Sequence, residues 1–184
     1  LAVLLLAVLA LAGGAEAQDP EWSYDTGSNV LSVAVSADGE YIVASNYEGK
    51  KIFLFDKDSS TPLWSYTTGS DVNSVAISAD GEYIVAGSQD NKVYLFDKDS
   101  STPLWSYSSG GSMISVDISA DGEYIAAGGY DDKVYLFNRD NSTPLWSYSA
   151  PGDVQSVAIS ADGEYIAAGT GYQYRLFLFA KDSS

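Results

Sequence analysis

Short apolar runs separated by polar turns recur along most of the chain. Each stretch of about 41 residues holds four runs rich in Val, Ile, Tyr, Phe and Trp, divided by clusters of Gly, Asp, Asn and Ser. Such runs are typical of strands joined by tight turns. In one stretch the predicted strands are 63–67, 72–78, 82–86 and 92–97. Between the second and third strands, Gly81 can take the positive φ that a tight hairpin needs.

The patterns within these strands predict sheets that are covered on both faces. In the second strand, Val75 and Ile77 alternate with Ser74 and Ala76, whereas the third and fourth strands are apolar at consecutive positions. A strand of an antiparallel sheet that is apolar on both faces needs another layer on each side.

The unit repeats four times. Trp22, Trp64, Trp105 and Trp146 are separated by 42, 41 and 41 residues, and the four Asp-Gly pairs keep the same intervals. Four strands in about 41 residues, repeated and covered on both faces, predict an all-β fold, a β-propeller of four-stranded antiparallel blades. The repeats cover about 22–63, 64–104, 105–145 and 146–184 of a propeller region that spans 18–184.

The number of blades stays open. Residues 21–24 match strand 63–67 and precede the first set of the other three strands. The sequence given ends after the strand that matches 92–97, so the last such set is not followed by a strand of the 63–67 type. Residues 21–24 could complete the last sheet and close a four-bladed ring. We instead expect part of a larger propeller, whose uncovered terminal sheets would be sites of self-association.

The first 17 residues differ from the repeats. Residues 1–12 are all Leu, Ala or Val, and Ala15 and Ala17 follow with the spacing of a signal-peptide cleavage site. We expect a cleaved signal peptide, with an uncleaved membrane anchor as the alternative. Either interpretation places the propeller outside the cytoplasm, as a secreted, cell-surface or periplasmic protein.

Composition narrows the chemistry. The chain has 25 acidic and 9 basic residues, a net charge of −16, so nucleic acid is not an expected partner. It contains no Cys and no His, which excludes thiolate and histidine catalysis, disulfides and ordinary zinc sites. No metal or cofactor is expected, and the Asp-Gly-Glu segments, such as 80–82, indicate turns with solvated carboxylates.

Residues 74–97 resemble the WD40 and WD40-like repeat, with its second-strand pattern, Asp-Gly turn, Gly-Ser-x-Asp loop and final aromatic-Asp pair. The chain lacks the Gly-His pair of that family, and Phe55, Phe96, Phe137 and Phe179 stand where its final Trp occurs. Residues 97–107 are similar to the docking segment of quinoprotein-type propellers, in which a Trp packs against the next blade. The resemblance implies a β-propeller of this broad kind.

Candidate binding residues lie on the loops that vary most between repeats. The loops after the third strands are 46–50, 88–91, 129–132 and 170–174. The loops between the first and second strands, 70–71, 110–112 and 150–153, are expected on the same rim. Variable loops on a rigid frame are common binding sites. The candidates are Tyr47, Asp71, Gln89, Tyr130, Asp153, Tyr172 and Tyr174.

Asp117 is a separate anomaly. It stands on a predicted inner strand where the other repeats have Ala34, Ala76 and Ala158. A carboxylate at that position must be hydrated or paired. We expect it to face the central channel, wetted by water or bonded to neighbouring Ser hydroxyls, with a cation or a ligand amine as the alternative.

These observations favour a non-enzymatic scaffold that binds a protein or polysaccharide through the variable rim. One alternative is the propeller part of an extracytoplasmic enzyme, quinoprotein-like or hydrolytic, with its catalytic residues elsewhere. Another is a structural repeat of a surface layer. Beyond a protein or polysaccharide, the possible contacts are a membrane, through the N-terminal segment, and a second copy of the chain.

Overall fold

The computed structural model describes residues 18–182, so the predicted signal peptide lies outside the described residues. Strands and turns make up this part of the chain, and it contains no helix. No helix in the described part is long and apolar enough to cross a membrane. The strands are β1 (Val30–Val35), β2 (Tyr41–Asn46), β3 (Lys51–Asp56), β4 (Trp64–Thr67), β5 (Val72–Ile77), β6 (Tyr83–Ser88), β7 (Lys92–Asp97), β8 (Trp105–Ser108), β9 (Met113–Ile118), β10 (Tyr124–Gly129), β11 (Lys133–Asn138), β12 (Trp146–Ser149), β13 (Val154–Ile159), β14 (Tyr165–Thr170) and β15 (Leu176–Ala180).

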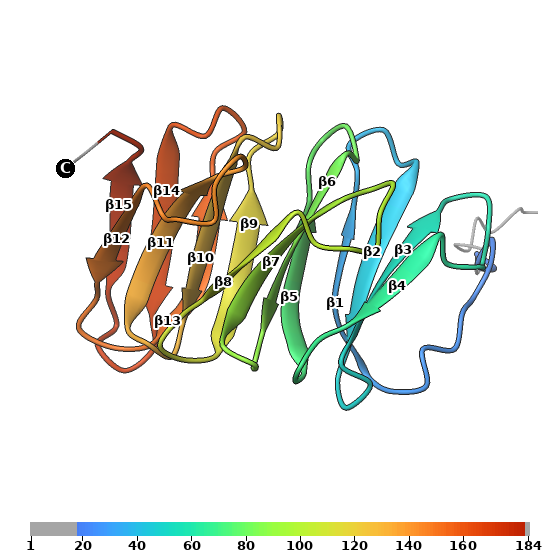
Figure 1. Ribbon diagram of the computed structural model, residues 1–184, viewed down its shortest axis with the longest axis horizontal. Coiled ribbons are helices and arrows are strands. Elements are labelled where there is room, and N and C mark those ends of the chain that lie inside the picture. The colour runs from blue at the N-terminus through green and yellow to red at the C-terminus, as the bar shows by residue number, and fades with distance from the viewer. Residues whose placement is uncertain (1–17, 183–184) are drawn as a thin grey trace, which may run out of the picture.

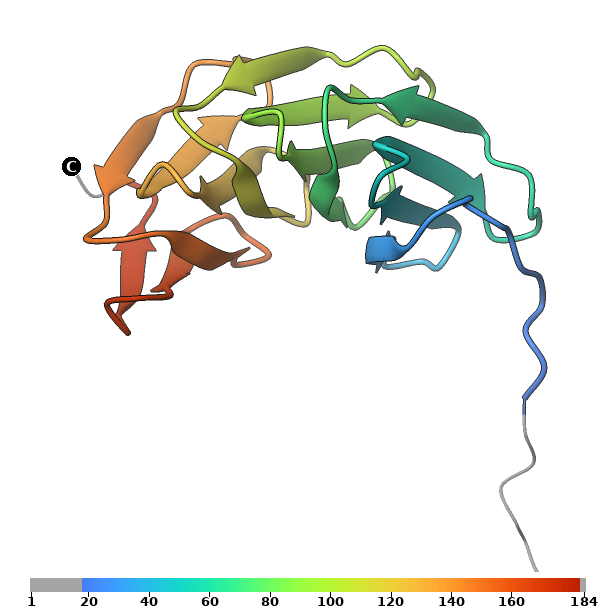
Figure 2. The same cartoon turned by 90° about the horizontal axis from the view of Figure 1, so that it is seen from below.

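The strands form four antiparallel sheets in chain order (Figure 1). Three sheets have four strands, β1-β2-β3-β4, β5-β6-β7-β8 and β9-β10-β11-β12, and the last has three, β13-β14-β15. The predicted all-β blade architecture is therefore confirmed, with strand limits that differ from the prediction by one or two residues. Figure 2 shows the sheets side by side in an open arc, with the first strand of each sheet on the concave side.

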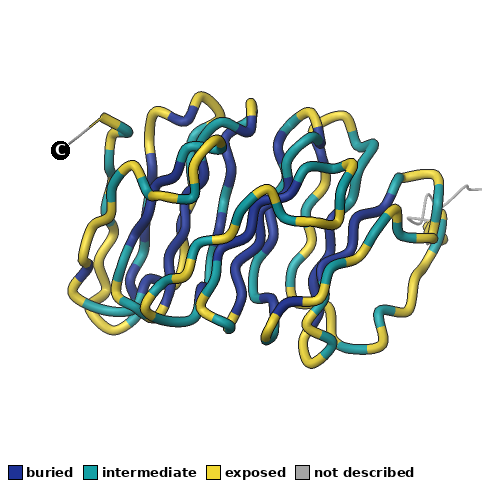
Figure 3. The backbone as a smooth tube through the Cα atoms, in the orientation of Figure 1, coloured by how far each residue is buried: buried dark blue, intermediate teal, exposed yellow. Residues whose placement is uncertain are grey.

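Three buried layers hold the sheets together. Leu54 and Val75 belong to the layer between the first and second sheets, Leu95 and Val116 to the next, and Leu136 and Val157 to the third. These residues are at most 7% exposed. Figure 3 shows the buried backbone concentrated in the strands. Because the two middle sheets are covered on both faces, β6, β7, β10 and β11 are apolar at consecutive positions, as the sequence predicts.

Each tryptophan fastens one sheet to the next. The Trp64 ring lies 5.4 Å from that of Phe96 in the following sheet, and its indole N–H donates to the Lys98 carbonyl at 2.7 Å. Trp105 and Trp146 make the equivalent contacts one and two sheets further on. The quinoprotein-like docking segment predicted from the sequence therefore packs as expected.

Residues 21–24 do not form a strand and do not complete the last sheet. They lie against the outer face of the first sheet, with the Trp22 ring 5.3 Å from that of Phe55 and the Trp22 indole N–H donating to the Lys57 carbonyl at 2.6 Å. These are the contacts that Trp64 makes with the second sheet. The alternative in which residues 21–24 complete the last sheet of the same chain and close a four-bladed ring is therefore wrong.

Candidate functional site

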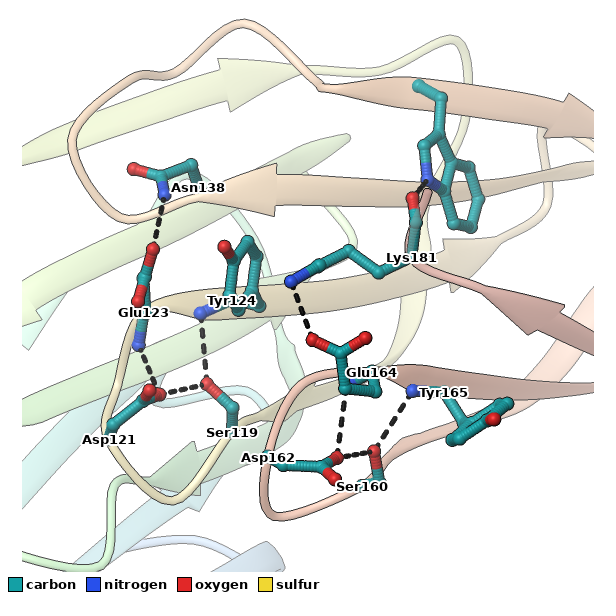
Figure 4. Close-up of polar contacts among 11 residues, drawn as sticks. Ser119, Asp121, Glu123, Tyr124, Asn138, Ser160, Asp162, Glu164, Tyr165 and Lys181 are labelled. Atoms are coloured by element: carbon teal, nitrogen blue, oxygen red, sulfur yellow. Dashed lines mark hydrogen bonds and ion pairs between the residues drawn. The ribbon is translucent and has the colours of Figure 1, made fainter. Parts of the chain in front are cut away.

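The two rims of the arc differ in how their polar groups are used. On one rim, the hydrogen bonds of the Asp-Gly turn are the same in every repeat. The Ser119 hydroxyl donates to Asp121 Oδ1 at 2.6 Å, which also accepts from the Glu123 amide at 2.9 Å, while the Tyr124 amide donates to the Ser119 oxygen (Figure 4). The hydrogen bond from Ser119 and that from the Glu123 amide hold the pKa of Asp121 below its usual value.

Three of the four glutamates of this rim pair with a lysine while their side chains stay 43–49% exposed, so ion pairs are added to the solvated carboxylates expected from the sequence. Lys181 Nζ lies 2.7 Å from a Glu164 carboxylate oxygen and 4.7 Å above the Tyr124 ring centroid (Figure 4). Lys98 and Glu82 form the equivalent pair at 3.5 Å. Since turns, ion pairs and tryptophan contacts occupy these groups, the Asp-Gly rim offers few free groups for a ligand.

The opposite rim carries the variable loops, and the structure brings the two predicted loop sets together there. The Gln89 amide donates to the Asp71 carbonyl, and the Tyr130 amide donates to the Ser112 carbonyl. In the last sheet the Gly171 amide donates to the Asp153 carbonyl. The loops that follow β6, β10 and β14 therefore lie beside the loops that precede β5, β9 and β13, the first strands of the same sheets.

Two of the predicted site residues are engaged within the protein. An Asp71 carboxylate oxygen accepts from the Glu48 amide of the preceding sheet at 2.8 Å. The Gln89 side-chain amide donates to the Asn73 side-chain oxygen at 3.0 Å, and Asn73 in turn donates to the Met113 carbonyl. These polar residues join neighbouring loops of the rim.

The predicted tyrosines, in contrast, present their rings to solvent. Tyr172 and Tyr174 are 78% and 92% exposed, Tyr130 is 52% exposed and Tyr47 is 39% exposed. Tyr47, Gln89 and Tyr130 occupy the same place in successive sheets, because each amide donates to a carbonyl of the adjoining loop. The rim thus combines a hydrogen-bonded frame with exposed aromatic rings.

Two pairs, each of a half-buried aspartate and a buried tyrosine, fix the middle loops, and they were not predicted from the sequence. The Tyr94 hydroxyl donates to Asp90 Oδ2 at 2.5 Å, and the same oxygen accepts from the Gly69 amide at 2.8 Å. Asp131 and Tyr135 repeat this arrangement in the third sheet. Burial, and then the neighbouring carboxylate, raise the pKa of each phenol well above its ordinary value.

A sequence signal for these pairs existed. Asp and Tyr occur together, four residues apart, in the second and third repeats only. The first and fourth repeats have Phe53 and Phe177 at the tyrosine position, and their loops are one residue longer.

Asp117 lies between the third and fourth sheets and is bonded to backbone amides, not to Ser hydroxyls. Its Oδ2 accepts from the Ile159 amide at 2.8 Å and its Oδ1 from the Ile118 amide at 2.9 Å. Burial raises the pKa of this carboxyl, and the two amide bonds oppose that effect. Residues 18–182 contain no group of three potential metal-ligating carboxylates. Asp117 therefore acts as a bridge between neighbouring inner strands.

Repeated four-stranded sheets, tryptophan docking between them and a variable rim define a β-propeller repeat protein. A family model described as outer membrane protein assembly factor BamB matches residues 7–172. Because the match spans most of the sequence, the chain belongs to this family of quinoprotein-like propeller repeats. The result agrees with the resemblance of its docking segment. No curated protein matches the chain.

Proposed function

We propose that this chain is a non-enzymatic, extracytoplasmic scaffold that binds a protein partner through the variable rim. The observation that carries the proposal is the set of exposed tyrosines on that rim, above all Tyr172 and Tyr174. Tyrosine supplies a large amphipathic contact area with few rotatable bonds, and it is enriched in protein interfaces. The rim around these rings is braced by hydrogen bonds between loops, which lowers the cost of ordering on binding.

The family supports a protein partner and an extracytoplasmic location. Its description is that of an outer membrane assembly factor, and an assembly factor acts on other proteins. The apolar run of residues 1–12 supports export to the same side of the membrane. Polysaccharide is the second candidate, since exposed tyrosine rings can also stack on the apolar faces of sugars.

The test removes the tyrosine rings and compares two rims. The site variant replaces Tyr130, Tyr172 and Tyr174 with Ser. The control variant replaces with Ser three leucines that are 52–53% exposed at the starts of the outer strands, away from the variable loops: Leu63, Leu104 and Leu145. Both changes remove exposed apolar area while leaving the core intact.

Each immobilised protein is incubated with the extracytoplasmic protein fraction of the source cell, and bound proteins are quantified by mass spectrometry. We expect a partner that binds the unchanged chain and the leucine variant and is lost from the tyrosine variant. Equal binding by all three proteins, or no specific protein bound, would overturn the proposal. Retardation in gels that contain neutral or acidic polysaccharides, lost only in the tyrosine variant, would identify polysaccharide as the ligand class instead.

A further inference from the structure

The two end sheets of the arc each leave an apolar face uncovered. Leu178 on the last sheet is 70% exposed, whereas its counterparts in the three preceding sheets, Leu54, Leu95 and Leu136, are fully buried. Val33 on the first sheet is 65% exposed, although its counterparts Val75, Val116 and Val157 are at most 7% exposed. Apolar patches of this kind on a soluble protein mark sites of association.

The two uncovered faces are the two halves of the contact that joins every pair of neighbouring sheets. In each of the three interior layers, the leucine of one sheet and the valine of the next belong to the same buried cluster. Leu178 and Val33 are the remaining members of the two series. The face around Leu178 therefore has the composition that packs on the face around Val33, but the two lie at opposite ends of the arc (Figure 2).

The strand edges are complementary in the same way. Within residues 18–182 the last sheet ends at β15 and has no outer fourth strand. Residues 21–24 dock on the first sheet through Trp22, just as the outer strand β4 docks on the second sheet through Trp64. They hold the position of an outer strand whose own sheet is missing from the described residues. A pocket of about 160 Å³ opens beside them on the uncovered face, lined in part by Tyr24, Val30 and Val33.

The register of the complete sheets predicts which residues would meet. Leu54 pairs with Trp64, and the same pairing joins Leu95 with Trp105 and Leu136 with Trp146. By the same register Leu178 would pair with Trp22.

The charges at the other end of this strand pair also match. Lys51, Lys92 and Lys133 face Thr67, Ser108 and Ser149 in the complete sheets, and the corresponding residues in the incomplete pair are Arg175 and Asp25. Both are exposed, so a cation would face a carboxylate.

Hydrogen-bonding groups on the two end sheets are also complementary. The Val75 amide donates to the Ser32 hydroxyl of the preceding sheet, and the Val157 amide donates in the same way to Ser115. The equivalent donor and acceptor at the ends of the arc are the Val33 amide and the Ser156 hydroxyl.

We propose that a second copy of this chain docks head to tail, with its first sheet on the last sheet of the first copy. Residues 21–24 of each copy then supply the missing fourth strand to the β13-β14-β15 sheet of the other. Two such contacts close a ring of two copies, in which both apolar faces are buried. This contact is argued from the faces of the end sheets and not from the rim tyrosines, although Arg175 adjoins Tyr174, so its tests do not depend on the proposed function.

The first test is the mass of the full chain in solution, by light scattering after size exclusion in about 0.15 M salt, where surface charge is screened over about 8 Å. We expect twice the 19.6 kDa of one chain. Leu178→Asp and Val33→Asp, at the two faces, should each give a single-chain mass. Leu104→Asp, which changes a leucine that is 52% exposed in the middle of the arc, should remain a pair.

Mixing the two disrupted variants separates head-to-tail docking from general stickiness. Leu178→Asp retains an intact first sheet and Val33→Asp an intact last sheet, so the mixture regains one of the two contacts. We expect pairs to form in the mixture and in neither variant alone. A single-chain mass for the unchanged protein, or no pairing in the mixture, would overturn the proposal.

A cysteine pair tests the register. The chain has no native Cys, so Asp25→Cys with Arg175→Cys introduces the only thiols. Directly opposed strand residues lie within the Cα separation that a disulfide spans. Mild oxidation should give a covalent two-chain product from the double variant and none from either single variant. Equal cross-linking of a single variant, or a ladder of longer oligomers, would contradict the closed pair.

Discussion

Removal of one buried hydroxyl, in Tyr135→Phe, tests how firmly the middle loops of the variable rim are held. The Tyr135 side chain is 2% exposed, and its hydroxyl donates to Asp131 Oδ2 at 2.5 Å. The same carboxylate oxygen accepts from the Gly110 amide at 3.1 Å. Phe is the residue of the first and fourth repeats at this position, as in Phe53, so the ring should keep its packing.

The structure sets the size of the effect. A hydrogen bond to a charged acceptor contributes about 1.5–3 kcal/mol, and we expect Tyr135→Phe to lower the free energy of unfolding by that amount at pH 7. Tyr130→Phe is the matched control, because this tyrosine lies in the same loop and is 52% exposed. Its effect should stay within about 0.5 kcal/mol. Urea unfolding at equal protein concentrations measures both.

The pH dependence provides a sharper check. Burial and the Asp131 carboxylate raise the pKa of the Tyr135 phenol, so the folded state holds this proton more tightly than the unfolded state. The associated stability is fully present below the unfolded pKa of about 10 and is lost as the pH rises above it. The Tyr135→Phe variant lacks this phenol, so its free energy of unfolding does not fall through this titration.

The difference in unfolding free energy between the unchanged protein and Tyr135→Phe should therefore narrow by about 1 kcal/mol between pH 10 and pH 11. A difference that stays constant over this range would refute the linkage argument. An equal cost for Tyr130→Phe at pH 7 would refute the assignment of the effect to the buried pair.

Three further substitutions test the frame. Trp105→Phe removes the indole N–H bond to the Arg139 carbonyl at 2.7 Å and should lower the free energy of unfolding by about 1–2 kcal/mol in urea; an unchanged midpoint would contradict this docking contact. Gly122→Ala should lower the free energy of unfolding by about 1–3 kcal/mol, and by more than Gly39→Ala. Both glycines have positive φ, but of the two only Gly122 would place the new Cβ 2.6 Å from a tyrosine ring. Equal shifts of the melting temperature would refute the steric argument. Burial raises the pKa of the Asp117 carboxyl, so folding favours its protonated form, and ionisation at higher pH destabilises the unchanged protein. The free energy of unfolding of Asp117→Ala, measured in urea relative to that of the unchanged protein, should therefore be greater at pH 7 than at pH 4. The reverse order would contradict this argument.

The sheets were predictable because their determinants are local and repeated. Alternation in strand 72–77, apolar runs in the next two strands and a Gly with φ of +75° at Gly81 all act within a few residues. The regular spacing of the tryptophans, which marks the repeats, could also be read directly from the sequence. The docking partner of Trp64 could not be located to an atom, because its indole N–H reaches the Lys98 carbonyl 34 residues away.

The candidate site was predicted as a set of loops but not in its details. The variable loops lie on one rim because antiparallel sheets of equal length place alternate connections at the same end. Which polar residues remain free depends on contacts between repeats, and the sequence does not state these. Asp71 and Asp117 illustrate this, because both bond to amides of a neighbouring sheet.

Differences among the four copies point to where the rim can adapt to a partner. Asp90 and Asp131 brace the second and third loops through buried phenols. The fourth loop has Phe177 in place of that phenol and one extra residue, and it carries Tyr172 and Tyr174, which are 78% and 92% exposed. A loop without the brace can change conformation at lower cost, because no hydrogen bond to a buried tyrosine has to break. The first loop, with Phe53, also lacks the brace, but its Tyr47 is only 39% exposed, so the fourth copy is the one in which we expect the main partner contacts.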